Sequence, residues 1–221
     1  MTVEADGALR IVFDFGGVLF HWRPIELVRH YFPQHTRDDA AAHATVAVVF
    51  QGFTGDWAQF DRGVLEADEL GQRIAARTGL PLANVESLVA GVPRSLTPKA
   101  DTVALLKRLH AAGVTLHFLS NMPRLYAEHL DRTHPELMAH FRSGVYSAHV
   151  QLIKPEEAMY RLASERFGAP GHRLVLLDDV AANVSSARTH GWNALRFSDA
   201  ASCEAGLRAN GWWPSAAAGR Q

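Results

Sequence analysis

Cysteine is almost absent from this chain of 221 residues, since Cys203 is the only one. A lone thiol cannot form an internal disulfide, which is typical of proteins from reducing compartments. Long hydrophobic runs are also lacking. Even the apolar stretch over residues 40–50 is broken by His43 and Thr45, and a membrane span needs about 20 apolar residues. The sequence therefore predicts a protein that does not interact with the membrane and, with no basic and then apolar segment in residues 1–10, a cytoplasmic one.

A large net charge of either sign is missing as well. The 22 Lys and Arg residues nearly balance the 23 Asp and Glu residues, so the formal net charge is −1. Such a chain has no overall field to attract nucleic acid or an anionic membrane. Apolar residues make up 48% of the sequence, which is enough for a buried core and excludes disorder.

The chain does contain several short apolar runs that alternate with helical patterns. The helices are marked by proline near the start and glycine just after the end. This alternation predicts an α/β protein with a parallel sheet and helices on both faces. The expected strands are residues 11–13, 114–119, 145–148, 174–177 and 194–197, and the expected helices cover 97–113, 155–168 and 181–190.

Residues 21–96 break this alternation, because their apolar residues have helical spacing and no strand is evident. The segment follows the first strand directly, which predicts a helical lid over the carboxyl ends of the strands. We thus expect a core of residues 1–20 and 97–210, a helical cap of 21–96, and a tail of 211–221. In the tail, Trp212 and Trp213 are expected to dock and the last residues to fray.

Polar residues follow four of the strands: Asp14, the pair Ser120-Asn121, Lys154, and the pair Asp178-Asp179. A parallel sheet gathers the carboxyl ends of its strands in one crevice. A carboxylate nucleophile, further carboxylates for a divalent cation, and donors for phosphate oxygens are the groups that phosphoryl transfer through a covalent intermediate requires. The pattern indicates this chemistry.

These residues resemble the four motifs of the haloacid dehalogenase superfamily of hydrolases, in the order DFGGV (14–18), LSN (119–121), KPE (154–156) and LDD (177–179). The resemblance covers about residues 10–200. The first and third motifs are most similar to the bacterial sugar-phosphate (glucose-1-phosphate) phosphatases and to the phosphatase domain of soluble epoxide hydrolases. The resemblance implies a Rossmann-like parallel sheet with a small inserted α-helical cap, and hydrolase activity.

By this resemblance, Asp14 would be the nucleophile that becomes an aspartyl phosphate. Ser120, with Asn121, would hold phosphate oxygens near the start of a helix. Lys154 would bridge the nucleophile and the phosphate. Each residue also has an ordinary structural interpretation: a strand-end Asp that caps a turn, a Ser-Asn turn or N-cap, and a surface lysine before a helix.

The resemblance also implies Mg²⁺ between Asp14, the main-chain carbonyl of Gly16 and the Asp178-Asp179 pair. Asp179 would be a direct ligand, and Asp178 a direct ligand or one layer further out. Independently, two adjacent carboxylates at the end of a buried strand repel each other unless a cation neutralises them. The alternative is that the pair caps the helix that follows it. In either case, Asn183 on that helix would support the pair.

One position departs from the family's common phosphatase pattern. The residue two after the nucleophile is usually a second Asp that acts as general acid and base, and here it is Gly16. Either the leaving group departs without help, as an anomeric sugar phosphate could, or another residue gives the proton. His21 is a candidate for this role, although a solvated loop histidine is the more common case.

The cap carries four aromatic residues, Phe50, Phe53, Trp57 and Phe60, which we interpret as cap core rather than as a substrate site. Its arginines at positions 23, 29 and 37 could contact substrate or solvent. The leading hypothesis is a Mg²⁺-dependent phosphatase of a small phosphorylated metabolite, a sugar phosphate being one candidate. The alternatives are a 2-haloacid dehalogenase, against which the Asp178-Asp179 pair weighs, and a non-catalytic regulatory protein of the same fold.

Overall fold

The computed structural model describes residues 8–214 and contains one parallel sheet with the strand order β3-β2-β1-β4-β5. Apolar residues at the centre of the sheet are buried on both faces, as parallel strands require. This confirms the predicted α/β class. The third strand begins and ends two residues earlier than expected, because residues 147–149 form a 3₁₀ turn. The strands are β1 (Arg10–Phe13), β2 (Thr115–Ser120), β3 (Ser143–Tyr146), β4 (Leu174–Asp178) and β5 (Asn193–Arg196).

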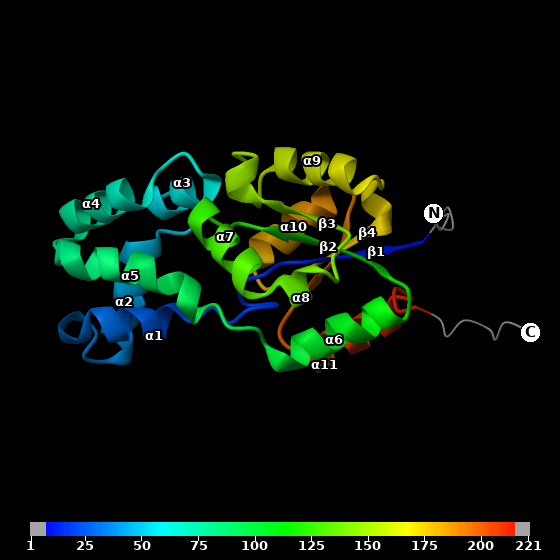
Figure 1. Cartoon of the computed structure of the whole chain (residues 1–221), viewed down its shortest axis with the longest axis horizontal. Helices are drawn as coiled ribbons and strands as arrows, with labels where there is room; N and C mark the ends of the chain where they lie inside the picture. Colours follow the sequence, from blue (N-terminus) through cyan, green and yellow to red (C-terminus); the bar gives the residue numbers. More distant parts are fainter. Residues whose placement is uncertain (1–7, 215–221) are drawn as a thin grey trace, which may run out of the picture.

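Helices cover both faces of the sheet (Figure 1). Successive residues of β1 point to opposite faces, so Ile11 and Phe13 belong to one core cluster and Val12 to the other. The first cluster includes buried residues of α6 and α11, and the second includes buried residues of α9 and α10. The helices of this part are α6 (Ala100–Ala111), α7 (Arg124–Thr133), α8 (Pro135–Met138), α9 (Glu157–Phe167), α10 (Ala181–Thr189) and α11 (Ala200–Ala209), with 3₁₀ turns η2 (Ser147–His149) and η3 (Gly171–Arg173).

Five helices lie between β1 and α6, at the left in Figure 1, and we call them the cap helices. Their ends follow from local sequence. Asp38 caps the first turn of α2, and α3 and α4 end at Gly63 and Gly79, which have positive φ. The division into core and cap domains at residues 20 and 97 stays a prediction. The cap helices are α1 (Pro24–Tyr31), α2 (Asp39–Phe50), α3 (Asp56–Arg62), α4 (Ala67–Thr78) and α5 (Leu82–Ser95), with a 3₁₀ turn η1 (Pro33–His35).

The carboxyl ends of β1 and β4 point toward the cap helices, whereas β1 begins at the opposite end of the molecule (Figure 1). Trp212 and Trp213 pack against the core, as expected, and Arg208 lies over the Trp213 ring. The predicted fraying of the tail falls on residues 215–221, which lie outside the described residues, as do residues 1–7. Within residues 8–214, none of the helices has the length and apolar character needed to span a membrane.

Candidate active site

The first predicted site residue, Asp14, lies one residue beyond β1, and its backbone N–H donates to the carbonyl of Leu177 on β4. This bond extends the ladder between the two strands and holds the carboxyl group in place. Oδ1 of Asp14 lies 2.9 Å from Nζ of Lys154 and accepts a hydrogen bond from the backbone N–H of Phe15. The carboxyl group is buried, with 7% of the residue exposed.

Lys154 is 1% exposed and makes three contacts through its ammonium group. Besides Asp14, it donates to Oδ2 of Asp178 at 2.6 Å and to the carbonyl of Leu119 at 2.8 Å. A surface lysine is therefore excluded. The lysine backbone is held by Asn121, whose side chain accepts from the Lys154 N–H and donates to its carbonyl. The Asn121 amide thus positions the lysine backbone, and Asn121 also lines the cavity described below.

The carboxylate pair ends β4, and its two members have different surroundings. Asp178 is fully buried and accepts hydrogen bonds from Lys154, from Nδ2 of Asn183 and from the backbone N–H of Val180. Asn183 thus supports the pair, as the sequence suggested. Asp179 is partly buried and lies beside Gly17, where φ is +78° and a Cβ would overlap the Asp179 carboxylate. The glycine at position 17 is therefore required twice, by its backbone conformation and by this close approach.

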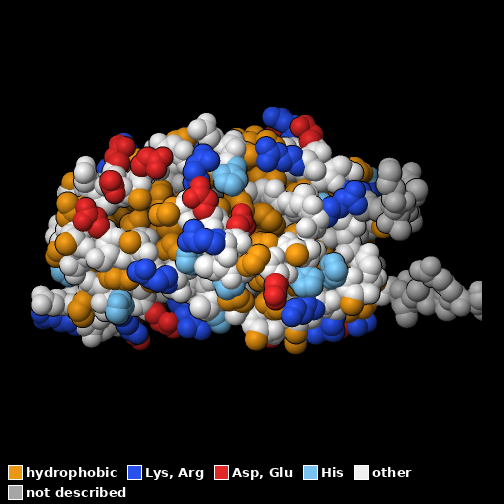
Figure 2. Space-filling view, viewed as in Figure 1, with side chains coloured by type: hydrophobic (Ala, Val, Ile, Leu, Met, Phe, Trp, Pro, Cys, Tyr) orange, Lys and Arg blue, Asp and Glu red, His pale blue; other side chains and the backbone are white. Residues whose placement is uncertain are grey.

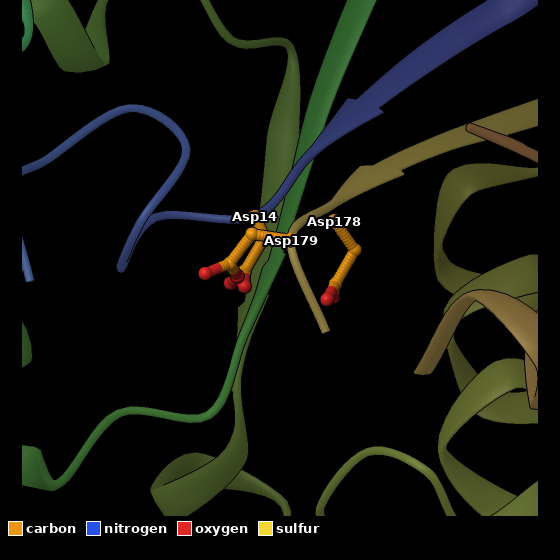
Figure 3. A group of neighbouring side chains, drawn as sticks. All are labelled: Asp14, Asp178 and Asp179. Atoms are coloured by element: carbon orange, nitrogen blue, oxygen red, sulfur yellow. The ribbon is translucent and has the colours of Figure 1, made fainter. Parts of the chain in front are cut away.

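Asp14, Asp178 and Asp179 form one cluster (Figure 3), in which one carboxylate oxygen from each lies within 4.8 Å of the others. Three carboxylates face one ammonium group there. Burial and the charges of Asp178 and Asp179 raise the pKa of Asp14 to about 7, although Lys154 opposes this shift, and burial and Asp178 raise the pKa of Asp179. Burial opposes the charge of Lys154, but Asp14 and Asp178 outweigh it and raise the pKa of the lysine. The cluster lacks positive charge, and a divalent cation would supply it.

Ser120 ends β2, and its hydroxyl is buried without a hydrogen-bond partner among the described residues. A buried hydroxyl that is left unpaired is rare and calls for an explanation, of which a bound ligand is one. The helix that was expected to begin beside Ser120 begins at Arg124 instead. Between them, the N–H of Met122 is taken by Oγ of Ser147, so that donor is not available to a ligand.

A cavity of about 230 Å³ opens above Asp14 and Lys154, between the core and the cap helices. Its charged lining residues are Asp14, Asp61, Lys154 and Asp179, and the rest of its wall is mostly apolar. Hydrophobic side chains also reach the surface where the cap helices meet the core (Figure 2). The apolar lining includes Trp22, Phe50, Phe53, Trp57, Val92 and Tyr126.

The interpretation of the cap aromatics as core holds for Phe60 and Trp57, which are buried in the first core cluster, and Phe50 packs against that cluster. Phe53 is exposed, and Phe50, Phe53 and Trp57 also line the cavity, which we did not predict from the sequence. The arginines suggested as substrate contacts are absent from the described lining. Arg23 pairs with Glu26 at the surface, and Arg29 pairs with Asp39.

His21, the suggested surrogate acid, does not line the cavity either. Its Nδ1 lies 3.2 Å from the guanidinium of Arg23 at the surface. The acid that does line the cavity is Asp61, near the end of α3, which we did not predict. Because Asp61 sits among the other charged residues of a cap helix, nothing in its local sequence separates it from a solvated helix residue. Only the docking of α3 on the core brings it to the site.

The comparison with protein families agrees with this geometry. A sequence model of the haloacid dehalogenase-like hydrolase family matches residues 10–191, which include all four motifs. The chain belongs to the haloacid dehalogenase-like hydrolases. It is therefore a hydrolase, and the predicted family resemblance is confirmed.

Relatives of this haloacid dehalogenase-like hydrolase include a phosphatase and a dehalogenase. It is 25% identical to the sesquiterpene phosphatase astK of Aspergillus oryzae over 85% of this chain and 89% of that protein. It is 33% identical to the (S)-2-haloacid dehalogenase of Pseudomonas putida over 44% of this chain and 42% of that protein.

Solved structures share the fold of this hydrolase. A predicted HAD-like family hydrolase from Porphyromonas gingivalis has a TM-score of 0.68 at 22% identity, over 91% of this chain and 98% of that one. A HAD family enzyme from Bacteroides thetaiotaomicron, in complex with magnesium and inorganic phosphate, has a TM-score of 0.66 at 16% identity, over 87% of this chain and 96% of that one. At these identities the likeness concerns the fold alone.

Proposed function

We propose that this hydrolase cleaves a phosphate monoester through an aspartyl phosphate formed on Asp14, with Mg²⁺ bound at the carboxylate cluster. The observation that carries the proposal is the buried contact of Asp14 with Lys154 at the base of the cavity. Lys154 holds one oxygen of Asp14, which orients the carboxylate, and its positive charge faces the place where phosphate charge would lie. The other Asp14 oxygen is then the nucleophile.

The donor set fits Mg²⁺, because hard carboxylate oxygens are the ligands that this ion prefers. Asp178 already accepts bonds from Lys154 and Asn183, so Asp14 and Asp179 are the better direct ligands, with the Gly16 carbonyl as a third. Asp178 would then act one layer further out and hold Lys154. When bound, the ion would supply the positive charge that stabilises the transferring phosphoryl group. The unpaired hydroxyl of Ser120 would donate to a phosphate oxygen.

The leaving group that fits the cavity best is apolar. A buried sugar needs a partner for each of its hydroxyl groups, and an unpaired buried hydroxyl costs about 1–3 kcal/mol. The wall formed by Trp22, Phe50, Phe53 and Trp57 offers almost no such partners. We therefore favour an apolar organic phosphate over the sugar phosphate considered from the sequence. The name of the Aspergillus oryzae relative, a sesquiterpene phosphatase, supports this choice.

A 2-haloacid dehalogenase is the second candidate, supported by the Pseudomonas relative and by the glycine at position 16. Its substrate carries a carboxylate that needs a cationic partner in the site. Within the described lining, the one cationic side chain is Lys154, and Asp14 and Asp178 already hold it. A phosphate group also needs a cationic partner, but Mg²⁺ bound at the acidic cluster would supply that positive charge. The site therefore favours the phosphatase.

The test is a substrate panel with purified protein in Mg²⁺ or in EDTA. It contains farnesyl phosphate, 4-nitrophenyl phosphate, glucose 1-phosphate, glucose 6-phosphate and 2-chloropropionate. We expect Mg²⁺-dependent phosphate release, fastest from farnesyl phosphate, and no chloride release. The variant Asp14→Asn should be inactive, and Asp101→Asn, at an exposed position of α6, should match wild type. Full activity in EDTA, or in Asp14→Asn, would contradict the proposal.

A further inference from the structure

Asp61 is held at the cavity by two connections between α3 and the core. Its own backbone carbonyl accepts a hydrogen bond from the hydroxyl of Ser147, which follows β3. The next residue, Arg62, forms a two-bond ion pair with Glu156, two residues after Lys154. These contacts fix the end of α3 beside the loop that carries Lys154. The side chain of Asp61 lines the same cavity as Asp14 and Lys154.

The Asp61 carboxyl group has no hydrogen-bond or ion-pair partner anywhere in residues 8–214. By contrast, the two buried acids of the site, Asp14 and Asp178, are both paired with Lys154. Removal of the Asp61 carboxyl group from water and the nearby negative charge of Asp14 raise the pKa of Asp61 to about 8, although Lys154 opposes this shift. An acid in this environment keeps its proton at neutral pH.

No other side chain of the described lining can act as the acid. Lys154 is held between Asp14 and Asp178, and Asp179 belongs to the metal cluster. The hydroxyl of Tyr126 donates to the carbonyl of Val89, and burial and Asp61 raise its pKa well above the usual value. Position 16, where the family's acid usually stands, is glycine. The cavity therefore contains one uncommitted proton donor.

We propose that Asp61 is the general acid and base of this enzyme, placed on the cap instead of on the nucleophile loop. The proposal rests on the phosphatase function proposed above. In the first step Asp14 bonds to phosphorus, the bond from phosphorus to the leaving oxygen breaks, and Asp61 gives its proton to that oxygen. In the second step water attacks phosphorus and gives a proton to Asp61, the bond to Asp14 breaks, and phosphate leaves. Both aspartates return to their starting states.

The first experiment measures kcat/KM for a series of aryl and alkyl phosphates in wild type and Asp61→Asn. A general acid matters most for basic leaving groups. In Asp61→Asn, kcat/KM should therefore fall about 10²–10⁴-fold for alkyl phosphates and less than about tenfold for 4-nitrophenyl phosphate. Asp61→Glu, which keeps the acid, should retain more alkyl phosphatase activity than Asp61→Asn. The control Asp68→Asn makes the same substitution at an exposed position of the cap and should leave every rate unchanged.

A second readout reports the hydrolysis step. With 4-nitrophenyl phosphate, Asp61→Asn should show a burst of one nitrophenol per active site and accumulate the aspartyl phosphate, because no base activates water. A merely structural role would slow both steps alike and give no burst. An equal loss on all leaving groups without a burst, or no loss at all, would overturn the role of Asp61 alone. The proposed function itself would fail if wild type released no phosphate from any substrate or if Asp14→Asn stayed active.

The acid can also be moved back to position 16. A Cβ at Gly16 would meet only the Trp22 side chain, 3.8 Å away, and the glycine does not have positive φ, so an aspartate fits there. In the double variant Asp61→Asn/Gly16→Asp, kcat/KM for alkyl phosphates should be at least about tenfold higher than in Asp61→Asn alone, and the burst should disappear. Such a recovery would support the assignment directly.

Discussion

Replacement of Lys154 by methionine tests the electrostatics of the site apart from its chemistry. Methionine fills a similar volume but leaves Asp14 and Asp178, at 2.9 Å and 2.6 Å from the lysine nitrogen, without their positive partner. Both carboxylates are buried, and removing one partner of a buried ion pair costs about 3–5 kcal/mol. With a urea dependence of about 3 kcal/mol per molar, the urea concentration at the unfolding midpoint should fall by about 1 to 1.7 M.

The assay is equilibrium urea unfolding in EDTA, so that no cation replaces the lost charge. Lys107→Met, at an exposed position of α6, is the matched control and should change stability by less than about 0.5 kcal/mol. Added Mg²⁺ should recover part of the loss in Lys154→Met and stabilise the control by mass action. A loss of less than about 1 kcal/mol in EDTA, as for an exposed ion pair, would refute the view that Lys154 neutralises the cluster.

Three further predictions concern single residues. Gly17→Ala should lower the free energy of unfolding by about 1–2 kcal/mol and weaken Mg²⁺ binding, because it forces an alanine into positive φ and against Asp179. The control Gly16→Ala should bind Mg²⁺ normally. Thermal unfolding measures the stability of both variants, and calorimetric titration measures their Mg²⁺ affinity. Folding raises the pKa of Asp61 from 3.8 to about 8, so the folded state binds more protons between these values and wild-type stability falls as pH rises through them. Asp61→Asn removes that decline, and its stability relative to wild type should increase from pH 5 to pH 8 in EDTA; the opposite trend would exclude the raised pKa. Cys203 is buried and its pKa is raised to about 12, so a thiol reagent should label it only after unfolding, and rapid labelling of native protein would show that α11 opens.

The sequence alone determined the sheet and the part of the site that the sheet carries. Short apolar runs mark buried strands. Asp14 and Asp178 come directly after such runs, and Lys154 follows the third strand after a short loop. Parallel strands place their carboxyl ends at one edge of the sheet. Residues that are far apart in the sequence therefore lie close together simply because each one follows a strand. The interactions of Lys154 and the support of Asp178 by Asn183 agree with that reasoning.

The tertiary structure decided everything that the cap contributes. Asp61, Phe50 and Trp57 lie on the cap helices α2 and α3, whose local sequences do not show which core surface each helix meets. The contacts of Ser147 with the Asp61 carbonyl and of Arg62 with Glu156 join segments 86 and 94 residues apart, and no local pattern encodes them. An acid that the nucleophile loop lacks is thus supplied from the cap, because packing brings together groups that the sequence keeps apart.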